Sequence, residues 1–158
     1  MLITQKKQYA LRAVYELARN EDGPPLKSAE IAQSQAIPQR FLKIILNRLK
    51  HAGIVVAKRG YTGGFHLKRP AAEITVHQIF MALDETCNEA TACVSCILEN
   101  DCPFYGACVF MPLWSQLQTA IDQICHNTTI QKLLDHAPEI GREGNKRKQS
   151  GKNATVKK

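Results

Sequence analysis

Hydrophobic residues near the start of the chain recur every three or four positions, the spacing of an amphipathic helix. This spacing predicts a first helix over residues 5–20, whose buried side consists of Tyr9, Ala10, Ala13, Leu17 and Ala18. The sequence Gly23-Pro24-Pro25 ends it, because proline cannot continue a helix. A short second helix is predicted around Ile31 and Ala32, with the hydroxyl of Ser28 as its cap.

The stretch PQRFLKIILNRLKHAG predicts a third helix with two distinct sides. The predicted buried side holds Phe41, Leu42, Ile45 and Leu49, and the opposite side holds Arg40, Lys43, Asn47 and Lys50. Pro38 suits the first helical position and Gly53 suits the end. Residues 34–37 form the preceding turn, so the pattern indicates a helix-turn-helix. Ala36 stands where such turns often have glycine, and a positive φ there would cost roughly 1 kcal/mol.

The polar side of this third helix has the residue types that read DNA. Arg40 and Asn47 suit base edges in the major groove and Lys43 suits base or phosphate oxygens, with Gln39 near the helix start. Taken alone, the same residues are equally consistent with a helix whose charges only face solvent.

Two short alternating segments, residues 54–57 and 65–68, predict a β-hairpin around Gly60, Gly63 and Gly64. A basic hairpin directly after a recognition helix is typical of the wing of a winged helix. We therefore expect the wing to contact the DNA backbone through Lys58, Arg59, Tyr61 and Gly63.

Further along, Thr75 is expected to cap a helix over residues 76–84, and Thr129 a short segment after it. Between them, residues 109–127 predict a long helix with a stripe of Leu113, Leu117, Ala120, Ile121 and Ile124. This stripe suits packing against the same helix of a second copy, although an intramolecular core would explain it too.

The expected fold is mostly α with a small β-hairpin wing, a winged helix-turn-helix plus a long dimerisation helix. Its parts are a DNA-binding domain (1–84), a cysteine-rich loop (85–108), a dimerisation region (109–136) and a disordered basic tail (137–158).

The net charge of +7 is unevenly distributed. Residues 1–82 hold 13 Lys and Arg against 5 Asp and Glu, whereas residues 83–136 hold 1 against 7. A basic half joined to an acidic half that carries cysteines indicates a polyanion-binding module attached to a sensing or assembly module.

Four cysteines fall within CVSCILENDCPFYGAC, residues 93–108. The chain opens without a signal-peptide pattern and has no apolar run of about 18 residues, so we expect a cytoplasmic protein without membrane contact. Cysteines clustered in that compartment favour metal binding or redox chemistry over disulfides. An iron–sulfur cluster, structural zinc, a disulfide, or a loop without cofactor regulated by thiol oxidation or a partner protein all remain open.

The segment RGYTGGFHLKRPAAEITVHQIFMALDE and the opening Tyr9-Ala10-Leu11-Arg12-Ala13 resemble the Rrf-two family of winged-helix transcription regulators. The resemblance covers about residues 1–135 and implies a homodimer that binds a palindromic operator in double-stranded DNA. Family members related to IscR and NsrR hold an iron–sulfur cluster through three cysteines, which here would be Cys96, Cys102 and Cys108.

Two positions depart from the resemblance: Met111 stands where IscR-like chains have histidine, and Gln8 where NsrR-like chains have aspartate. Cys93 is a candidate fourth ligand, and the alternative is a fourth position left to water, a small thiol or a residue of the second subunit. The pattern leaves both a two-iron and a four-iron cluster open. A small thiol or electron-transfer redox protein is the rival function, but the βαβ pattern it needs is missing around Cys93 and Cys96. We therefore expect a regulator, with repression as its action, and not an enzyme.

Overall fold

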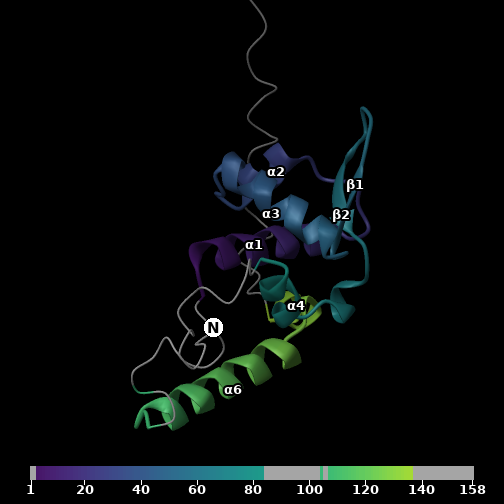
Figure 1. Cartoon of the computed structure of the whole chain (residues 1–158). Coiled ribbons are helices and arrows are strands. Elements are labelled where there is room, and N and C mark those ends of the chain that lie inside the picture. The colour runs from purple at the N-terminus through teal and green to yellow at the C-terminus, as the bar shows by residue number, and fades with distance from the viewer. Residues whose placement is uncertain (1–2, 84–103, 105–106, 137–158) are drawn as a thin grey trace, which may run out of the picture.

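The computed structural model describes residues 3–83, 104 and 107–136, and these form a mostly helical body with one β-hairpin (Figure 1). The predicted fold class is therefore confirmed. The elements in chain order are α1 (Gln5–Arg19), α2 (Ser28–Ser34), α3 (Gln39–His51), β1 (Val55–Lys58), β2 (Gly64–Leu67), the 3-10 turn η1 (Ala71–Glu73), α4 (Val76–Met81), α6 (Met111–Asn127) and α7 (Ile130–Asp135).

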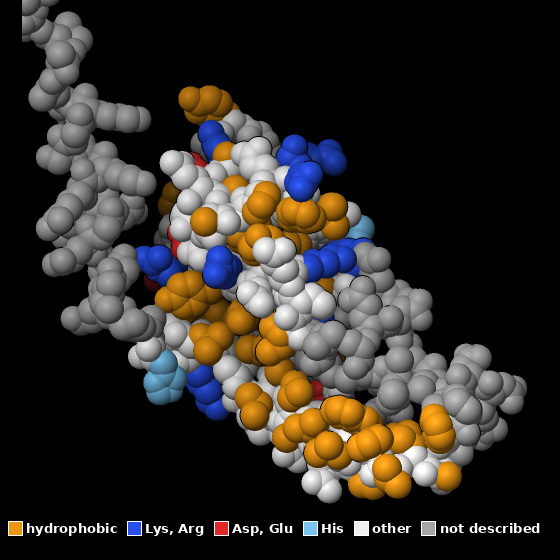
Figure 2. Space-filling view, turned by 90° about the vertical axis from the view of Figure 1, so that its left-hand side faces the viewer, with side chains coloured by type: hydrophobic (Ala, Val, Ile, Leu, Met, Phe, Trp, Pro, Cys, Tyr) orange, Lys and Arg blue, Asp and Glu red, His pale blue; other side chains and the backbone are white. Residues whose placement is uncertain are grey.

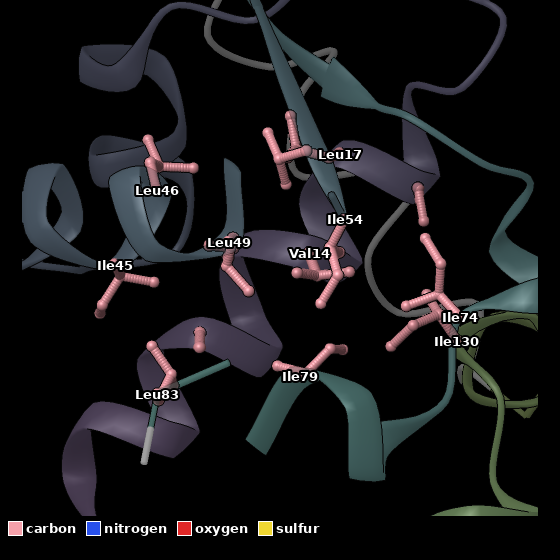
Figure 3. Packing of buried hydrophobic residues seen from close by; sticks show 14 of the residues in the cluster. Val14, Leu17, Ile45, Leu46, Leu49, Ile54, Ile74, Ile79, Leu83 and Ile130 are labelled. Atoms are coloured by element: carbon pink, nitrogen blue, oxygen red, sulfur yellow. The ribbon is translucent and has the colours of Figure 1, made fainter. Parts of the chain in front are cut away.

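A single cluster of buried hydrophobic residues joins α1, α3, α4 and α7 (Figure 3). α1 contributes Val14 and Leu17, α4 contributes Ile79, and α7 contributes Ile130. α7 thus packs with the N-terminal elements, although it follows α6 in the chain. The buried residues of α3 are Leu42, Ile45, Leu46 and Leu49.

Four residues depart from the predicted core. Phe41 is 41% exposed and lies outside the core, whereas Leu46 and Val14, which the prediction left out, are buried. Tyr9 is only partly buried against the core.

The helix ends agree with the sequence in some places and correct it in others. α1 begins after Thr4, whose hydroxyl accepts a hydrogen bond from the N–H of Lys7. α2 begins after Lys27 and not at a serine cap, because the carboxylate of Glu30 accepts from the N–H of Lys27 at 2.7 Å. Pro38 is the residue just before α3 and not its first helical residue as predicted, which is Gln39.

Gly53 ends α3 as predicted. Its φ of +71° is in the left-handed region, which glycine adopts without strain. The N–H groups of Gly53 and Ile54 donate to the carbonyls of Lys50 and Leu49, so the last turn of α3 is closed by a Schellman motif.

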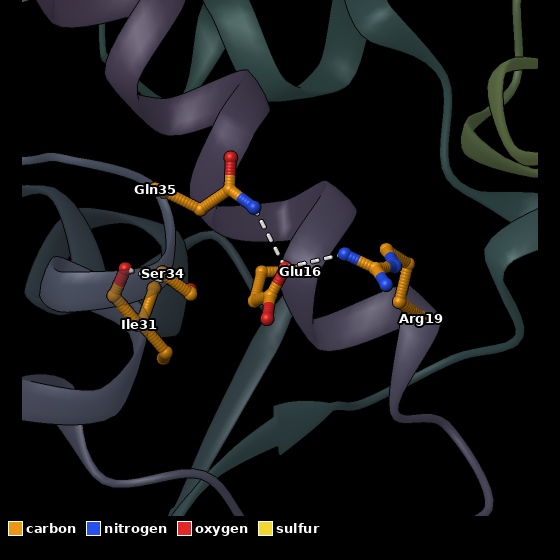
Figure 4. Close-up of polar contacts among 5 residues, drawn as sticks. All are labelled: Glu16, Arg19, Ile31, Ser34 and Gln35. Atoms are coloured by element: carbon orange, nitrogen blue, oxygen red, sulfur yellow. Dashed lines mark hydrogen bonds and ion pairs between the residues drawn. The ribbon is translucent and has the colours of Figure 1, made fainter. Parts of the chain in front are cut away.

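The turn between α2 and α3 contains Ala36, whose φ is +52°. Alanine therefore adopts the positive φ that costs a non-glycine residue roughly 1 kcal/mol. The turn is held to α1 by a 2.7 Å hydrogen bond from Gln35 Nε2 to Glu16 Oε2, and Glu16 also pairs with Arg19 at 3.4 Å (Figure 4). These contacts fix where α3 starts relative to the rest of the domain.

The hairpin pairs β1 and β2 antiparallel, with Val55 opposite Leu67 and Lys58 opposite Gly64. Both strands are shifted by one residue from the predicted ranges. Leu26 forms an isolated bridge with Phe65, so the segment before α2 lies along β2 and braces the wing.

The C-terminal part begins later than predicted, with Met111 rather than Val109 as the first residue of α6. α6 extends away from the body, and α7 returns to it through a bridge between Thr75 and Thr129 (Figure 1). The hydroxyls of Thr75 and Thr129 cap α4 and α7, as the sequence indicated. Asp84, most of the cysteine-rich segment and the tail 137–158 lie outside the described residues.

Candidate nucleic-acid interface

The outer side of α3 carries the four residues that the sequence assigned to DNA recognition. Gln39, Arg40, Lys43 and Asn47 are all exposed. They face outward because the opposite side of the helix is fixed in the core by its four buried aliphatic side chains. The positions 40, 43 and 47 recur every three or four residues and thus share one helical face.

A groove of about 750 Å³ runs between α3 and the hairpin. α3 contributes Lys43, Asn47 and Lys50 to its walls, and the hairpin contributes Ala57 and Phe65. The two lysines, beside an amide and apolar lining residues, give this groove the positive charge that suits a polyanion such as DNA.

The wing places its predicted contact residues at the far end of the hairpin. Lys58, Arg59 and Tyr61 are exposed, and Tyr61 is 96% exposed. Lys27, from the segment that braces the wing, has its ammonium 5.8 Å from the centre of the Tyr61 ring. The wing tip therefore combines an aromatic ring with three cationic side chains.

Gly63 has a structural reason to be glycine. A Cβ at this position would lie 2.4 Å from the carbonyl oxygen of Lys58, which is closer than any side chain permits. The N–H of Gly63 donates to the carbonyl of Gly60 at 3.0 Å, closing the turn. Gly63 is half-buried and shapes the wing, whatever contact it makes with DNA.

Phe41 is the residue near this surface that the sequence pattern placed wrongly. The guanidinium of Arg40 lies 4.8 Å from the centre of the Phe41 ring, and the Tyr9 ring lies 6.3 Å away on α1. The Phe41 ring therefore packs against the guanidinium of Arg40 at the edge of the core. Stacking of this kind restricts the directions in which a guanidinium can point.

The cysteine segment is represented among the described residues by its last member. Cys108 is partly exposed, and its carbonyl accepts a hydrogen bond from the N–H of Met111 at the start of α6. Cys93, Cys96 and Cys102 lie outside the described residues. In the part of the chain that the structure describes, no group of three His, Cys, Asp or Glu side chains could hold a metal ion.

The contact between α4 and α6 connects the DNA-binding part to the long helix. The rings of His77 and His126 stack with centres 3.6 Å apart, a contact that the sequence did not reveal. Next to it, Cys125 is buried, as expected for a cysteine that acts as a small apolar residue. Burial raises the pKa of the Cys125 thiol, and the carboxylate of Asp122 raises it further.

Much of α6 is apolar and exposed. Leu113, Trp114, Leu117 and Ile124 all remain open to solvent in the single chain, as does Phe110 just before the helix. Figure 2 shows hydrophobic side chains gathered over the lower end of the molecule, where Figure 1 places α6. Patches of this kind mark interaction surfaces.

None of the described helices is long and apolar enough to cross a membrane.

Comparison with known proteins agrees with this architecture. Residues 3–136 match the Rrf2 family, described as iron-dependent transcriptional regulators. IscR of Photobacterium profundum, an HTH-type transcriptional regulator, is 31% identical over 134 residues, which cover 85% of this chain and 76% of that protein. A putative HTH-type regulator of Haemophilus influenzae is 30% identical over 135 residues, covering 85% of this chain and 87% of that one.

Solved structures share the fold as well. T. potens IscR superimposes with a TM-score of 0.70 at 24% identity, covering 89% of this chain and 90% of that chain. CymR, titled the global cysteine regulator of B. subtilis, gives 0.69 at 25% identity, covering 87% and 99%. The protein therefore belongs to the Rrf2 family of DNA-binding transcription regulators, a family of regulators and not of enzymes.

Proposed function

We propose that this regulator is a cytoplasmic homodimeric repressor that reads a palindromic operator and whose operator affinity is set by an iron–sulfur cluster. The observation that carries the DNA-reading part is the exposed polar face of α3 beside a groove that it shares with a basic wing. A convex basic helix next to a basic hairpin matches the width of the major groove and the phosphates at its edge.

The residues of this surface divide into two roles. Arg40 and Asn47 contact base edges, because guanidinium and amide groups form paired hydrogen bonds with guanine and adenine. Lys58 and Arg59 contact phosphates and position the wing, contributing affinity without sequence preference. Lys43 and Gln39 lie on the same side of α3 and extend the base-reading surface. Tyr61 packs against the sugar–phosphate backbone at the wing tip.

Dimerisation is assigned to α6. Three residues of its apolar stripe, Leu113, Leu117 and Ile124, are between 46% and 66% exposed in the single chain. An exposed apolar surface of this kind is typical of an interface. A second copy of the same helix, related by a two-fold axis, would cover the stripe and place two α3 helices on one face of DNA.

The cluster is assigned to Cys96, Cys102 and Cys108, with Cys93 as the candidate fourth ligand. Three or four thiolates from one short segment are the donor set that iron–sulfur clusters use, and Cys108 is accessible to such a group. The cluster would supply a redox-active, oxidant-sensitive group whose gain or loss constrains or releases the cysteine segment. The likeness to IscR and the description of the family as iron-dependent support this assignment.

The chain offers a route from Cys108 to the DNA-reading helix. Cys108 lies three residues before α6, and α6 contacts α4 through the His77–His126 stack. Beyond α4, the carbonyl of Leu83 accepts a hydrogen bond from Arg48 of α3. A shift of α6 relative to α4 would therefore act on α3 through groups already in contact.

The reading surface is tested by comparing Arg40→Ala with Lys58→Ala on duplexes that the parent protein selects from a randomised pool. We expect Arg40→Ala to relax selection at one base position per half-site, at a cost of about 1–3 kcal/mol. Lys58→Ala should weaken all duplexes alike and reduce the slope of log affinity against log salt by about one. If both variants bind and select as the parent does, α3 and the wing are not the reading surface.

A second candidate is a regulator without cofactor that responds to thiol oxidation. The likeness to CymR favours it, because Staphylococcus aureus CymR has been solved in an oxidized form and resembles this chain with a TM-score of 0.67. In that case two of the cysteines in residues 93–108 would form a disulfide on treatment with peroxide. Operator affinity would then change with the fraction of protein that carries the disulfide and not with the iron content.

A further inference from the structure

Ile44 is an exposed aliphatic residue in the middle of the polar face of α3. It is 51% exposed, although isoleucine is among the residues most often buried. Arg40 lies one turn before it and Asn47 nearly one turn after it, so all three share the face assigned to DNA reading. Ile44 also lines the groove between α3 and the hairpin, together with Lys43 and Asn47.

The core does not account for this side chain. The buried side of α3 is already occupied by Leu42, Ile45, Leu46 and Leu49, and Ile44 projects away from them. A single exposed hydrophobic residue is ordinary on a protein surface, so its exposure alone carries little weight. The position of Ile44 is the stronger evidence for a role, because Ile44 lies between the polar groups that are expected to reach base edges.

The major groove presents one apolar feature to a protein, the C5-methyl group of thymine. An aliphatic side chain placed between a guanidinium and an amide would bury that methyl group while its neighbours bond to adjacent bases. We propose that Ile44 is a specificity residue that recognises one thymine in each half-site by contact with its C5-methyl group. This proposal rests on the proposed role of α3 as the reading helix.

The test uses duplexes that the full-length protein selects from a randomised pool, each thymine being replaced in turn by deoxyuridine at symmetric positions. Deoxyuridine lacks only the C5-methyl group and keeps the same hydrogen-bonding edge. We expect the parent to lose about fourfold in affinity per half-site at one position, the effect of exposing one buried methyl-sized group. At that position Ile44→Ala should bind the thymine and deoxyuridine duplexes equally.

Controls separate this proposal from the broader one. Met81→Ala removes a comparably exposed apolar side chain on α4, outside the groove, and should keep the parent's preference for thymine. Ile44→Val retains part of the contact and should keep part of the preference, which guards against a folding defect in the alanine variant.

Two results would overturn the proposal: a parent that discriminates at no thymine, or an Ile44→Ala variant that discriminates as the parent does. The Asn47→Ala variant then shows whether the proposal for Ile44 alone is wrong or the proposal for α3 as well. If Asn47→Ala alters the selected sequence, α3 still reads the operator and only the role of Ile44 is wrong. If Asn47→Ala also selects and binds as the parent does, the reading surface itself has been misassigned.

Discussion

Arg48 Nη1 of α3 donates a 2.9 Å hydrogen bond to the backbone carbonyl of Leu83. Leu83 is buried just after α4 and is the last described residue before the segment that carries the cysteines. The hydrogen bond joins the proposed DNA-reading helix to the residue after which that segment begins. Arg48 lies on the same helix as Arg40 and Asn47 but is turned toward the protein.

Replacing Arg48 with leucine should destabilise the domain, because the buried Leu83 carbonyl loses its charged donor. Leaving such an acceptor unsatisfied costs about 1–3 kcal/mol in unfolding free energy, measurable by urea denaturation. Lys50→Leu is the matched control, since it also removes a cation from α3 but at an exposed position. Equal stability of the two variants would show that the hydrogen bond has no stabilising role.

Ala36→Gly should stabilise the protein. At φ +52° the alanine Cβ is strained against its own backbone, and glycine removes a strain of roughly 1 kcal/mol, partly offset by the greater freedom of glycine in the unfolded chain. Ala29→Gly, at an exposed site in the helical part of α2, should instead lose about 0.5–1 kcal/mol. Changes of the same sign in thermal or urea unfolding would contradict the strain at Ala36.

Leu117→Glu should convert the proposed dimer to a monomer, because it places a charge in the middle of the exposed stripe on α6. Sedimentation velocity measures the change directly, and affinity for a full palindrome should fall toward that for a half-site. Ser115→Glu adds the same charge on the opposite side of α6 and should leave the dimer intact. A Leu117→Glu protein that still sediments as a dimer would exclude this face as the interface.

The two described cysteines should differ in their reaction with iodoacetamide. Burial, with the nearby carboxylate of Asp122, raises the pKa of Cys125, so its thiol stays protonated to higher pH in the folded protein than in the unfolded chain. In reduced, metal-free protein we expect rapid labelling of the partly exposed Cys108, and labelling of Cys125 only after unfolding or at strongly alkaline pH. Mass spectrometry over a pH series would report both rates, and equal rates in native protein would contradict the burial of Cys125.

Hydrophobic periodicity and capping residues predicted most elements because both are local properties of the chain. The pattern over residues 5–20 predicted α1 to within one residue, and Thr75 and Thr129 marked the starts of α4 and α7. The core of α3 was less certain because several rotations of the helix satisfy the same pattern. The structure selects the rotation that buries Leu46 and leaves Phe41 beside Arg40.

In the candidate site, too, the sequence predicted the features that depend on local patterns and missed those that depend on contacts between distant residues. Arg40, Lys43 and Asn47 lie on the outer face of α3, where the spacing placed them, but their contacts with bases stay predictions. The His77–His126 stack and the Arg48–Leu83 hydrogen bond join residues 49 and 35 positions apart, so no local pattern could reveal them. The cap of α2 was missed because Lys27 and not a serine is the N-cap residue, and the side-chain acceptor at this helix end is the carboxylate of Glu30, which accepts from the N–H of Lys27. The ligand roles of the cysteines also stay predictions.

The most direct measurement is anaerobic purification of the parent, Cys108→Ala and the buried control Cys125→Ala, followed by absorption spectra, iron and sulfide content, and affinity for a selected palindromic duplex. We predict brown parent and Cys125→Ala proteins that contain iron and sulfide, and a colourless Cys108→Ala protein with altered affinity for the duplex. A Cys93→Ala variant in the same series would show whether Cys93 is the fourth ligand. A parent that is colourless, holding zinc or no metal, or whose iron and sulfide survive the loss of Cys108, would contradict control by a cluster at these cysteines.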